Sequence, residues 1–291
     1  MGGAKILAGL AALGLLAGCG RSGRLVVGAK GFTEQLILGE ILAQHLERRL
    51  KLQVDRKLTL GGTLLSHQAL VNGELDLYPE YTGTALTAIL KLPLSSDPAA
   101  VLEKVRAEYR SRWGVEWLDP LGFNNTFAMA IRGEEARRGG LETLSDAARR
   151  PAGWKLGMGY EFQQRPDGLA GLVKTYGLRL DGSPRSMDLG LLYKAMEQKQ
   201  VDIISANATD GMLSVMDLKV LRDDKSYFPP YQAAVVARAA SLAAHPGLRE
   251  ALAELSGAFT DQAMQKLNHE VDGKRRRAAE VAAEFLGTLR R

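Results

Sequence analysis

The hydrophobic positions alternate between short apolar runs and longer stretches with helical spacing. A strand is predicted at residues 25–28, which read Leu-Val-Val-Gly, and a helix from Thr33 to about Leu50. Within that helix the apolar residues recur three and four positions apart, which places them on one face. Thr33 is of the residue type that caps a helix N-terminus, so we expect it to begin the helix as its cap.

The same alternation continues along the chain. A strand is predicted near residues 53–57, then a turn at residues 61–63, a helix to about Asn72 and a short strand at residues 75–78. Gly73 fits the position after a helix end, because glycine adopts the left-handed conformation at no steric cost. Strands that alternate with helices predict a mostly parallel α/β sheet.

An internal echo suggests that this unit occurs twice. Residues 69–78 are echoed 126 positions later by residues 195–204. Both segments read as a helix end, a tight turn and a buried strand, followed by a polar loop with threonine and glycine. Because ligands of such sheets bind beyond the carboxyl ends of the strands, we predict two similar lobes that face one cleft. Tyr81 and Asn207 would then lie on opposite walls.

Two segments break the pattern and mark candidate lobe boundaries. Residues 117–125 are a plausible first crossing between the lobes, and residues 226–231 a plausible return. Residues 241–291 have helical spacing and predict two or three helices that pack on the first lobe. The predicted lobes are therefore residues 25–122 plus 232–291 for the first, and residues 123–231 for the second.

The N-terminus has the layout of an export signal. Lys5 precedes an apolar run that ends in small residues and is too short to span a membrane stably. The ending Leu16-Ala17-Gly18-Cys19 resembles the bacterial lipoprotein box, in which the cysteine is lipidated and becomes the first mature residue. We therefore predict a signal peptide at residues 1–18, lipid attachment at Cys19 and a tether at residues 19–24. An ordinary signal peptide with a chance cysteine and a plain membrane anchor are the alternatives.

This signal predicts where the protein works. The chain would be exported, either to a periplasm or to the outer face of the cytoplasmic membrane, and held there through Cys19. No later stretch of the sequence approaches the length of about 18 apolar residues that a membrane span needs. The remainder is therefore expected to be a tethered domain outside the cytoplasm.

Composition excludes several classes of protein. A chain of 291 residues that is 46% apolar and 24% charged can bury a core and is not disordered throughout. A single cysteine excludes a disulfide scaffold, a zinc ribbon, an iron–sulfur cluster and a CxxC redox centre, and the four histidines form no metal-binding pair. The net charge of +5 comes from basic clusters that sit among acids, which favours solvated helix faces over a nucleic-acid interface.

No motif for catalysis or nucleotide binding is present. The sequence lacks a GxSxG elbow, a GxxxxGK[ST] loop and an HExxH pair, and residues 157–162 lack the third glycine of a dinucleotide fingerprint. Carboxylates near turns, such as Glu34 and Glu80, are not paired by the sequence as a general acid and base. We therefore predict a protein that is not an enzyme and holds no cofactor and no metal, with dispersed catalytic residues as the open alternative.

Features of a small-molecule site stand out instead. Lys30 and Gln35 flank the N-terminus of the first predicted helix, where free N–H groups and the helix dipole favour anions. Thr84 follows Tyr81 by three residues and could donate its hydroxyl to the same ligand group. An anionic or polar ligand group is therefore expected near these residues.

Aromatic residues in turn-rich segments suggest a site for a cation. Tyr81, Phe127 and Tyr227 lie in such segments, and several rings around a cation attract it through their negative π faces. Taken singly, each tyrosine is more often a packing residue. Tyr78 would point to the opposite face of its strand and is expected in the core.

The candidate segments also carry a family resemblance through their order. They are Lys30-Gly31-Phe32-Thr33-Glu34-Gln35, Leu60-Gly61-Gly62-Thr63, residues 76–84 (Asp-Leu-Tyr-Pro-Glu-Tyr-Thr-Gly-Thr), Phe123-Asn124-Asn125-Thr126, Glu161-Phe162 with Arg165-Pro166-Asp167-Gly168, and residues 223–231. Together they resemble the substrate-binding proteins of ABC importers for the osmoprotectants glycine betaine, choline and carnitine. The resemblance runs from about residue 25 to the C-terminus. It implies a two-lobed periplasmic-binding-protein fold of α/β class, type II-like, with the ligand in the interlobe cleft.

The resemblance also implies roles for individual residues. Tyr81 and Tyr227 would belong to a cage around a trimethylammonium head, which Asn125 would touch. The polar end of the ligand would meet Lys30, Gln35, Thr84 and Arg165. Phe127 and Asn207 stand where the family usually has tyrosine. The ring missing at Asn207 would cost about 2 kcal/mol, roughly thirtyfold in affinity.

These implications define the functional prediction and its alternatives. We predict a monomeric, lipid-anchored receptor that delivers a quaternary-ammonium or related zwitterionic solute to an ABC permease, without chemistry and without nucleic acid. Asn207 could instead hydrogen-bond a larger ligand, such as ergothioneine or another betaine-type amino acid. A surface hydrolase and a sensory lipoprotein that does not transport are the remaining alternatives.

Overall fold

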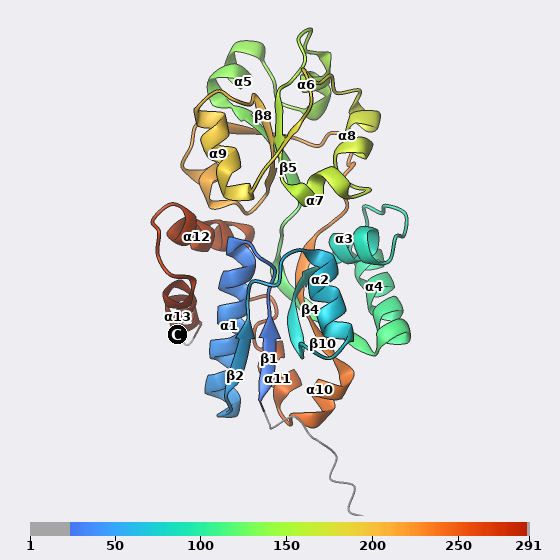
Figure 1. Ribbon diagram of the computed structural model, residues 1–291, viewed down its shortest axis with the longest axis vertical. Helices are drawn as coiled ribbons and strands as arrows, with labels where there is room; N and C mark the ends of the chain where they lie inside the picture. The colour runs from blue at the N-terminus through green and yellow to red at the C-terminus, as the bar shows by residue number, and fades with distance from the viewer. Residues whose placement is uncertain (1–23, 290–291) are drawn as a thin grey trace, which may run out of the picture.

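Two lobes are stacked along the long axis of the molecule (Figure 1). The computed structural model describes residues 24–289, so the predicted signal peptide and Cys19 lie outside the described residues. Each lobe is built on one five-stranded sheet with helices packed around it. The predicted two-lobed α/β fold is confirmed.

The first lobe contains both ends of the described chain. Its sheet has the strand order β2 (Val54–Lys57), β1 (Leu25–Gly28), β3 (Leu77–Tyr81), β10 (Gln232–Arg238) and β4 (Val115–Asn124). The surrounding helices are α1 (Thr33–Leu50), α2 (Thr63–Val71), α3 (Thr82–Thr84), the π-helical turn η1 (Ala85–Ile89), α4 (Pro98–Trp113), α10 (Ala239–Ala244), α11 (Leu248–Ala253), α12 (Asp261–Asp272) and α13 (Ala278–Thr288). Strands β1, β2 and β3 are parallel, and β10 is antiparallel to both of its neighbours.

The second lobe repeats this plan. Its sheet has the order β7 (Arg185–Ser186), β6 (Leu156–Met158), β8 (Ile203–Asn207), β5 (Phe127–Arg132) and β9 (Leu218–Leu221). Its helices are α5 (Gly133–Gly139), α6 (Leu144–Arg149), α7 (Tyr160–Gln164), α8 (Leu169–Tyr176), α9 (Leu189–Glu197) and the 3-10 turn η2 (Gly211–Ser214). Here β5 is the antiparallel strand. In each sheet the antiparallel strand is the first one after a crossing between the lobes.

The internal echo of the sequence has a direct structural counterpart. β3 and β8 occupy the same place in the two strand orders, and their bounds differ by the same 126 positions as the echo. The turns before them also correspond, because Gly73 has φ 76° and Lys199 has φ 56°. Tyr81 and Asn207 are therefore equivalent last residues of equivalent strands.

The chain passes between the sheets twice. The first crossing lies between β4 and β5, and the second between β9 and β10. The two crossings run side by side, since the Asn125 N–H donates to the Tyr231 carbonyl at 3.1 Å and the Tyr231 N–H to the Asn124 side chain at 2.7 Å. These contacts join the lobes by a short two-stranded connection.

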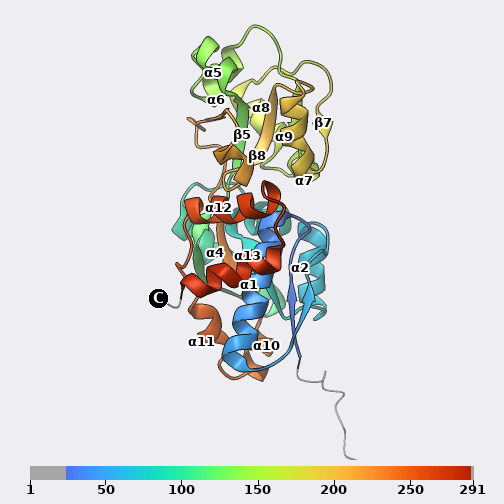
Figure 2. The same cartoon turned by 90° about the vertical axis from the view of Figure 1, so that its left-hand side faces the viewer.

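Helix α1 anchors the first lobe. Its apolar face is fully buried, as the spacing of the sequence predicts, through residues that are each at most 1% exposed: Ile37, Leu38, Ile41, Leu42 and Leu46. Burial of each such side chain stabilises the fold by about 1.5–3 kcal/mol. Figure 2 shows α12 and α13 crossing α1, which they contact together with α11. The C-terminal segment thus packs on the first lobe, but as four helices (α10 to α13) instead of the two or three predicted.

Two local predictions are wrong. Thr33 is the first helical residue and not the cap, which is Phe32, because the Thr33 hydroxyl donates to Asp272 of α12 at 2.6 Å. The third strand begins at Leu77 and ends at Tyr81, later than predicted from residues 75–78, since Asp76 instead accepts the Val26 N–H at 2.8 Å.

Among residues 24–289, no helix has the length and apolar character needed to cross a membrane.

Candidate functional site

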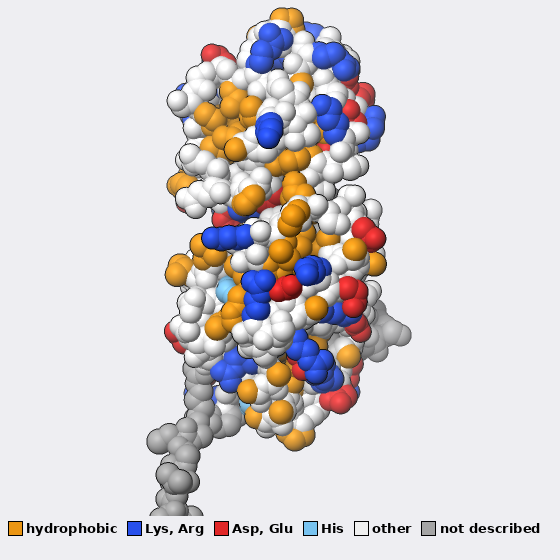
Figure 3. Space-filling view, turned by 90° about the vertical axis from the view of Figure 1, so that its right-hand side faces the viewer, with side chains coloured by type: hydrophobic (Ala, Val, Ile, Leu, Met, Phe, Trp, Pro, Cys, Tyr) orange, Lys and Arg blue, Asp and Glu red, His pale blue; other side chains and the backbone are white. Residues whose placement is uncertain are grey.

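A cleft of about 780 Å³ lies between the two lobes. Figure 3 shows the waist at which the lobes meet and the hydrophobic side chains gathered at that level. Tyr81 and Asn207, at the carboxyl ends of β3 and β8, both line the cleft. The cleft therefore has the position that the sheet topology favours for a ligand, and its volume is within the range of small-molecule sites.

Tyr81 forms the centre of the first-lobe wall. Its ring stacks on Phe32 at 6.5 Å between centroids, and the Lys30 ammonium lies 5.2 Å from the ring centroid. Its hydroxyl donates to Glu34 at 2.7 Å and accepts from the Gln35 amide at 3.1 Å. Burial and then the negative charge of Glu34 raise the pKa of Tyr81 well above 10.0, so the ring presents a neutral phenol.

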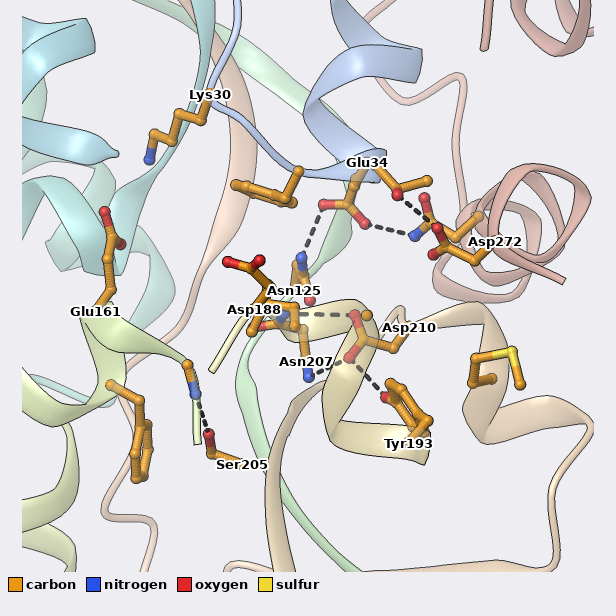
Figure 4. A pocket seen from close by; sticks show the side chains of 18 of the residues that line it. Lys30, Glu34, Asn125, Glu161, Asp188, Tyr193, Ser205, Asn207, Asp210 and Asp272 are labelled. Atoms are coloured by element: carbon orange, nitrogen blue, oxygen red, sulfur yellow. Dashed lines mark hydrogen bonds between the residues drawn. The ribbon is translucent and has the colours of Figure 1, made fainter. Parts of the chain in front are cut away.

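Glu34 accepts hydrogen bonds from four side chains, an arrangement that the sequence does not reveal. Its carboxylate accepts hydrogen bonds from Tyr81, from Asn125 at 2.8 Å, from Asn268 at 3.1 Å and from the Thr209 hydroxyl. Burial raises the pKa of Glu34 although all four donors act to lower it. Figure 4 shows this carboxylate between the Asn125 amide and the side chains near Asp272. Because Thr209 belongs to the second lobe, Glu34 ties the two walls together.

Two buried cations, Lys30 and Arg165, line one end of the cleft. Lys30 pairs with Glu80 at 2.5 Å and donates to the Thr63 hydroxyl at 3.0 Å. Arg165 of the second lobe pairs with Asp167 at 2.5 Å and donates to the Thr84 hydroxyl of the first lobe at 2.8 Å. Each cation thus has a carboxylate behind it and still lines the cleft, where it can meet an anionic group.

A second group of rings surrounds Arg165. Phe127 packs edge-on against Phe162 at 4.9 Å and against Tyr231 at 5.6 Å. The Arg165 guanidinium lies 5.0 Å from the Phe127 ring and 5.4 Å from the Tyr231 ring. Tyr231 also donates its hydroxyl to Asp167. These rings and the Arg165 guanidinium therefore lie together in the lining of the cleft.

Asn207 begins a polar corner on the second lobe. Its backbone N–H donates to Asp210 at 3.0 Å, and the Tyr193 hydroxyl donates to the same carboxylate at 2.6 Å. Burial raises the pKa of Asp210, against the lowering effect of these donors. This corner replaces the ring that the family resemblance would place at residue 207.

Glu161 bridges the lobes at the cleft entrance. Its carboxylate accepts the Thr63 N–H at 2.7 Å and the Thr63 hydroxyl at 3.1 Å, at the N-terminus of α2. Burial acts to raise the pKa of Glu161, but Lys30, Arg165 and the Thr63 donors outweigh it and hold the pKa below its usual 4.5. The contact is thus made by an ionised carboxylate at a helix N-terminus, where a negative charge is favoured.

The structure brings most of the sequence-predicted site residues to this cleft. The residues that line it are Lys30, Tyr81, Thr84, Asn125, Phe127, Arg165 and Asn207. Gln35 lies behind Tyr81 and positions its hydroxyl. Tyr227 lies outside the residues that line the cleft, and its hydroxyl approaches the Pro166 and Gly168 carbonyls at 3.3 Å.

Other lining residues were not identified from the sequence as ligand contacts. They include Phe32, Glu34, Glu161, Phe162, Tyr193, Asp210 and Tyr231. Phe32 and Glu34 lie within the motif of residues 30–35, and Tyr231 lies within residues 223–231, four residues after Tyr227. Their position within these motifs was the signal from which they could have been identified as ligand contacts. In residues 24–289 no group of three histidine, cysteine, aspartate or glutamate side chains is arranged to hold a metal ion.

Comparison with known proteins places these features in a family. Residues 23–288 match the family described as "OpuAC: Substrate binding domain of ABC-type glycine betaine transport system". The chain is 34% identical to the carnitine transport binding protein OpuCC of Listeria monocytogenes, over 89% of this chain and 85% of that protein. It is 38% identical to a glycine-betaine-binding protein of Pseudomonas aeruginosa, over 95% of this chain and 92% of that protein.

A third relative is longer than this chain. The ergothioneine transport permease/ergothioneine binding protein EgtU of Helicobacter pylori is 37% identical over 91% of this chain, which spans only 47% of that protein. Among solved structures, a glycine betaine/carnitine/choline ABC transporter protein has a TM-score of 0.77 at 34% identity, covering 91% of this chain and 98% of that one. Apo YehZ from Escherichia coli has a TM-score of 0.69 at 30% identity, covering 92% and 99%.

Proposed function

Since the chain belongs to the family of substrate-binding domains of ABC-type glycine betaine transport systems, we propose that its cleft binds a betaine-type zwitterion. Such a solute carries a quaternary ammonium group and a carboxylate. The protein is the extracytoplasmic binding component of an importer, and it presents the solute to a membrane permease.

The observation that carries this proposal is the set of aromatic side chains that line the cleft. Phe32 and Tyr81 border it from the first lobe, and Phe127 borders it next to Tyr231. A quaternary ammonium has no N–H to donate, so aromatic faces are the groups best suited to hold it after desolvation. Each such contact contributes about 2 kcal/mol when water is excluded.

The cationic end of the cleft suits the carboxylate of the same solute. Lys30 and Arg165 are both buried and both line the cleft, and the Thr84 hydroxyl lies beside Arg165. Charge-assisted hydrogen bonds from such groups are stronger than neutral ones and fix orientation. A zwitterion would therefore bind with its ends in a defined order. Binding without chemistry is part of the proposal, because the family consists of the substrate-binding domains of transport systems.

The remaining parts of the proposal concern attachment and movement. Cys19 carries a lipid that holds a monomer at the outer face of the membrane. The units 25–122 plus 232–291 and 123–231 move about the paired crossings and close on the solute. Contacts that reach from lobe to lobe, such as Thr209 to Glu34 and Glu161 to Thr63, support this movement as a closing step.

Calorimetric titration tests the proposal. The chain from Gly20 onward is titrated with glycine betaine, carnitine, choline and ergothioneine. We expect micromolar or tighter binding to at least one of them, and loss of that binding in a Tyr81→Ala variant that still melts cooperatively. Absence of heat and of thermal stabilisation with all four compounds would overturn the proposed ligand class and leave the family membership unaffected.

A further inference from the structure

The cleft extends from its aromatic and cationic part to lining residues of α9, of η2 and of the segments beside them, which we call the second compartment. Its apolar side chains are Met187, Leu189, Tyr193, Met212 and Met216, and Lys194 and Glu197 of α9 line it as well. Figure 4 shows the two ends of the cleft, with Lys30 and Glu161 on one side and Tyr193 and Asp272 on the other. A small betaine would meet both the aromatic rings and the cations within the first part, so it would leave the second compartment empty.

The Asp210 carboxylate borders this compartment with one oxygen nearly free. Its Oδ2 accepts from the Tyr193 hydroxyl at 2.6 Å and from the Asn207 N–H at 3.0 Å. Its Oδ1 accepts only a long hydrogen bond of 3.4 Å from the Asn207 amide. In the part of the chain that the structure describes, no ion pair joins Asp210 to a lysine or an arginine. Asp210 is partly buried, so its contact with water is restricted, and a ligand N–H at Oδ1 would supply the close donor that this oxygen lacks.

The electrostatic surroundings favour the same kind of group. Burial raises the pKa of Asp210, and the negative charge of Asp272 on α12 adds to the effect. The same Asp272 charge contributes to the raised pKa of Tyr193. Asp188 also lines this part of the cleft. Two cations, Lys194 and Arg275, line the cleft as well, and Arg275 acts to lower the pKa of Asp272. The compartment thus combines apolar side chains with three aspartates, of which Asp210 has no cation paired with it among residues 24–289.

An independent observation comes from Asn268 of α12. Its amide nitrogen donates to Glu34 at 3.1 Å and to the Thr209 carbonyl at 2.8 Å, which fixes the orientation of the amide. Its Oδ1 has no hydrogen-bond partner, although the side chain is only 2% exposed and the residue lines the cleft. In addition to Asp210 Oδ1, the residues that line the cleft thus include a second acceptor that lacks a donor.

We propose that the compartment formed by Tyr193, Asn207 and Asp210 is a subsite for an N–H-donating group of the ligand. The preferred solute is then a betaine with an N–H-bearing side chain, and not a small betaine such as glycine betaine. This inference rests on the proposed function, because it assumes that the quaternary ammonium and carboxylate occupy the first part of the cleft. The N–H group donates to Asp210 Oδ1 while its carbon skeleton packs against the methionines.

Titration of the wild-type chain with matched betaines tests the ligand class. Glycine betaine has no N–H group, histidine betaine and ergothioneine carry a heterocyclic N–H, and lysine betaine carries a second cationic nitrogen. We expect at least one of the last three to bind roughly tenfold or more tightly than glycine betaine, the gain of one hydrogen bond to a charged group. The compound with the larger gain shows whether the N–H donor is a neutral heterocycle or a cation.

Variants of the chain then assign the gain to the subsite. Asp210→Asn should remove the advantage of the N–H-bearing betaine and leave the affinity for glycine betaine unchanged. Tyr193→Phe, a milder change to the same corner, should reduce the advantage in part and serves if Asp210→Asn does not fold. Asp217→Asn is the control, because Asp217 is an exposed aspartate of the same lobe paired with Arg137 at 2.7 Å.

The outcomes separate this inference from the proposed function. The subsite would be overturned if glycine betaine bound as tightly as the other betaines. It would also be overturned if Asp210→Asn lowered the affinity for every ligand by the same factor. Both outcomes would leave the proposed function standing. Failure of every betaine to bind would overturn both.

Discussion

The bridge between Glu161 and Thr63 should control how readily the lobes close. Glu161 accepts two hydrogen bonds from Thr63, at 2.7 and 3.1 Å, across the cleft entrance. Hydrogen bonds to a buried charge contribute about 1.5–3 kcal/mol each, but this side chain is 45% exposed, so solvent reduces the value. We therefore assign about 1–3 kcal/mol to the pair in total, which corresponds to roughly 5–150-fold in the equilibrium between closed and open forms.

Replacement of Glu161 by alanine removes both hydrogen bonds and should shift that equilibrium toward the open form. The apparent Kd of the ligand varies inversely with the fraction of closed molecules. That fraction cannot fall by more than the equilibrium constant for closure does, so the Kd should rise by no more than the same factor. The melting temperature should change little, since the Glu161 side chain is 45% exposed and its loss removes no apolar side chain from a core. Gln164→Ala is the matched control, because Gln164 is an exposed residue of the same helix.

The assay follows the distance between the lobes directly. Cys19 is the only cysteine of the sequence, so a chain that starts at Gly20 can be labelled at cysteines placed at Ser111 and Arg138, one exposed residue in each lobe. Energy transfer between the labels reports the closed fraction with and without ligand. If Glu161→Ala leaves both the transfer efficiency and the Kd at wild-type values, the bridge does not stabilise the closed form.

Acid should have the same effect as the substitution. The pKa of Glu161 in the bridge is held below its usual 4.5, so the stabilisation is present above pH 4.5 and is lost as the pH falls through the lowered value. The closed fraction of the wild type should fall in that window. Glu161→Gln should show no such fall, and an identical acid response in this variant would assign the titration to another group.

Further predictions concern the cleft and the core. Phe127→Leu keeps the apolar volume and loses the π face, so affinity for the quaternary ammonium should fall roughly tenfold or more in calorimetry, while Tyr227→Phe, outside the cleft lining, should leave it unchanged. In Gly211→Ala the new Cβ would lie 2.3 Å from a backbone nitrogen of α12, so closure and affinity should both weaken. In the control Gly287→Ala, outside the cleft lining, the new Cβ meets nothing within 4 Å, so this variant should behave as wild type. Burial lowers the pKa of His67 to about 4, so stability should decrease by roughly 3 kcal/mol as the pH falls from about 6.5 to 4, and a His67→Phe variant that keeps this decrease in chemical denaturation would refute the assignment.

Much of the fold is predictable from the sequence, because it depends on local periodicity. The apolar spacing of α1 is a property of consecutive residues, and the echo between Gly73 and Lys199 follows from the same turn in two lobes. The start of α1 was misjudged because Thr33 bonds to Asp272, which is 239 residues away. Contacts of that range leave no local signal.

The same distinction between local patterns and long-range contacts applies to the residues of the candidate site. Tyr81, Phe127 and Arg165 were identifiable because they lie in recognisable motifs, and all three line the cleft. Glu34 was noted only as one carboxylate near a turn, since its four donors come from separate segments of both lobes. The raised pKa of Asp210 was likewise invisible, because burial is a property of the assembled lobes.

The paired crossings described in the fold also limit how the molecule can move. The Asn125 N–H donates to the Tyr231 carbonyl and the Tyr231 N–H donates to the Asn124 side chain, so sliding or twisting one crossing against the other would break these hydrogen bonds. Bending both together keeps those contacts, so we expect bending to be the softest motion of the joint. A solute that closes the lobes would then restrict mainly this bending, because the two crossings already limit the other motions. We therefore expect closure to cost little conformational entropy and to leave most of the interaction energy of the solute as affinity.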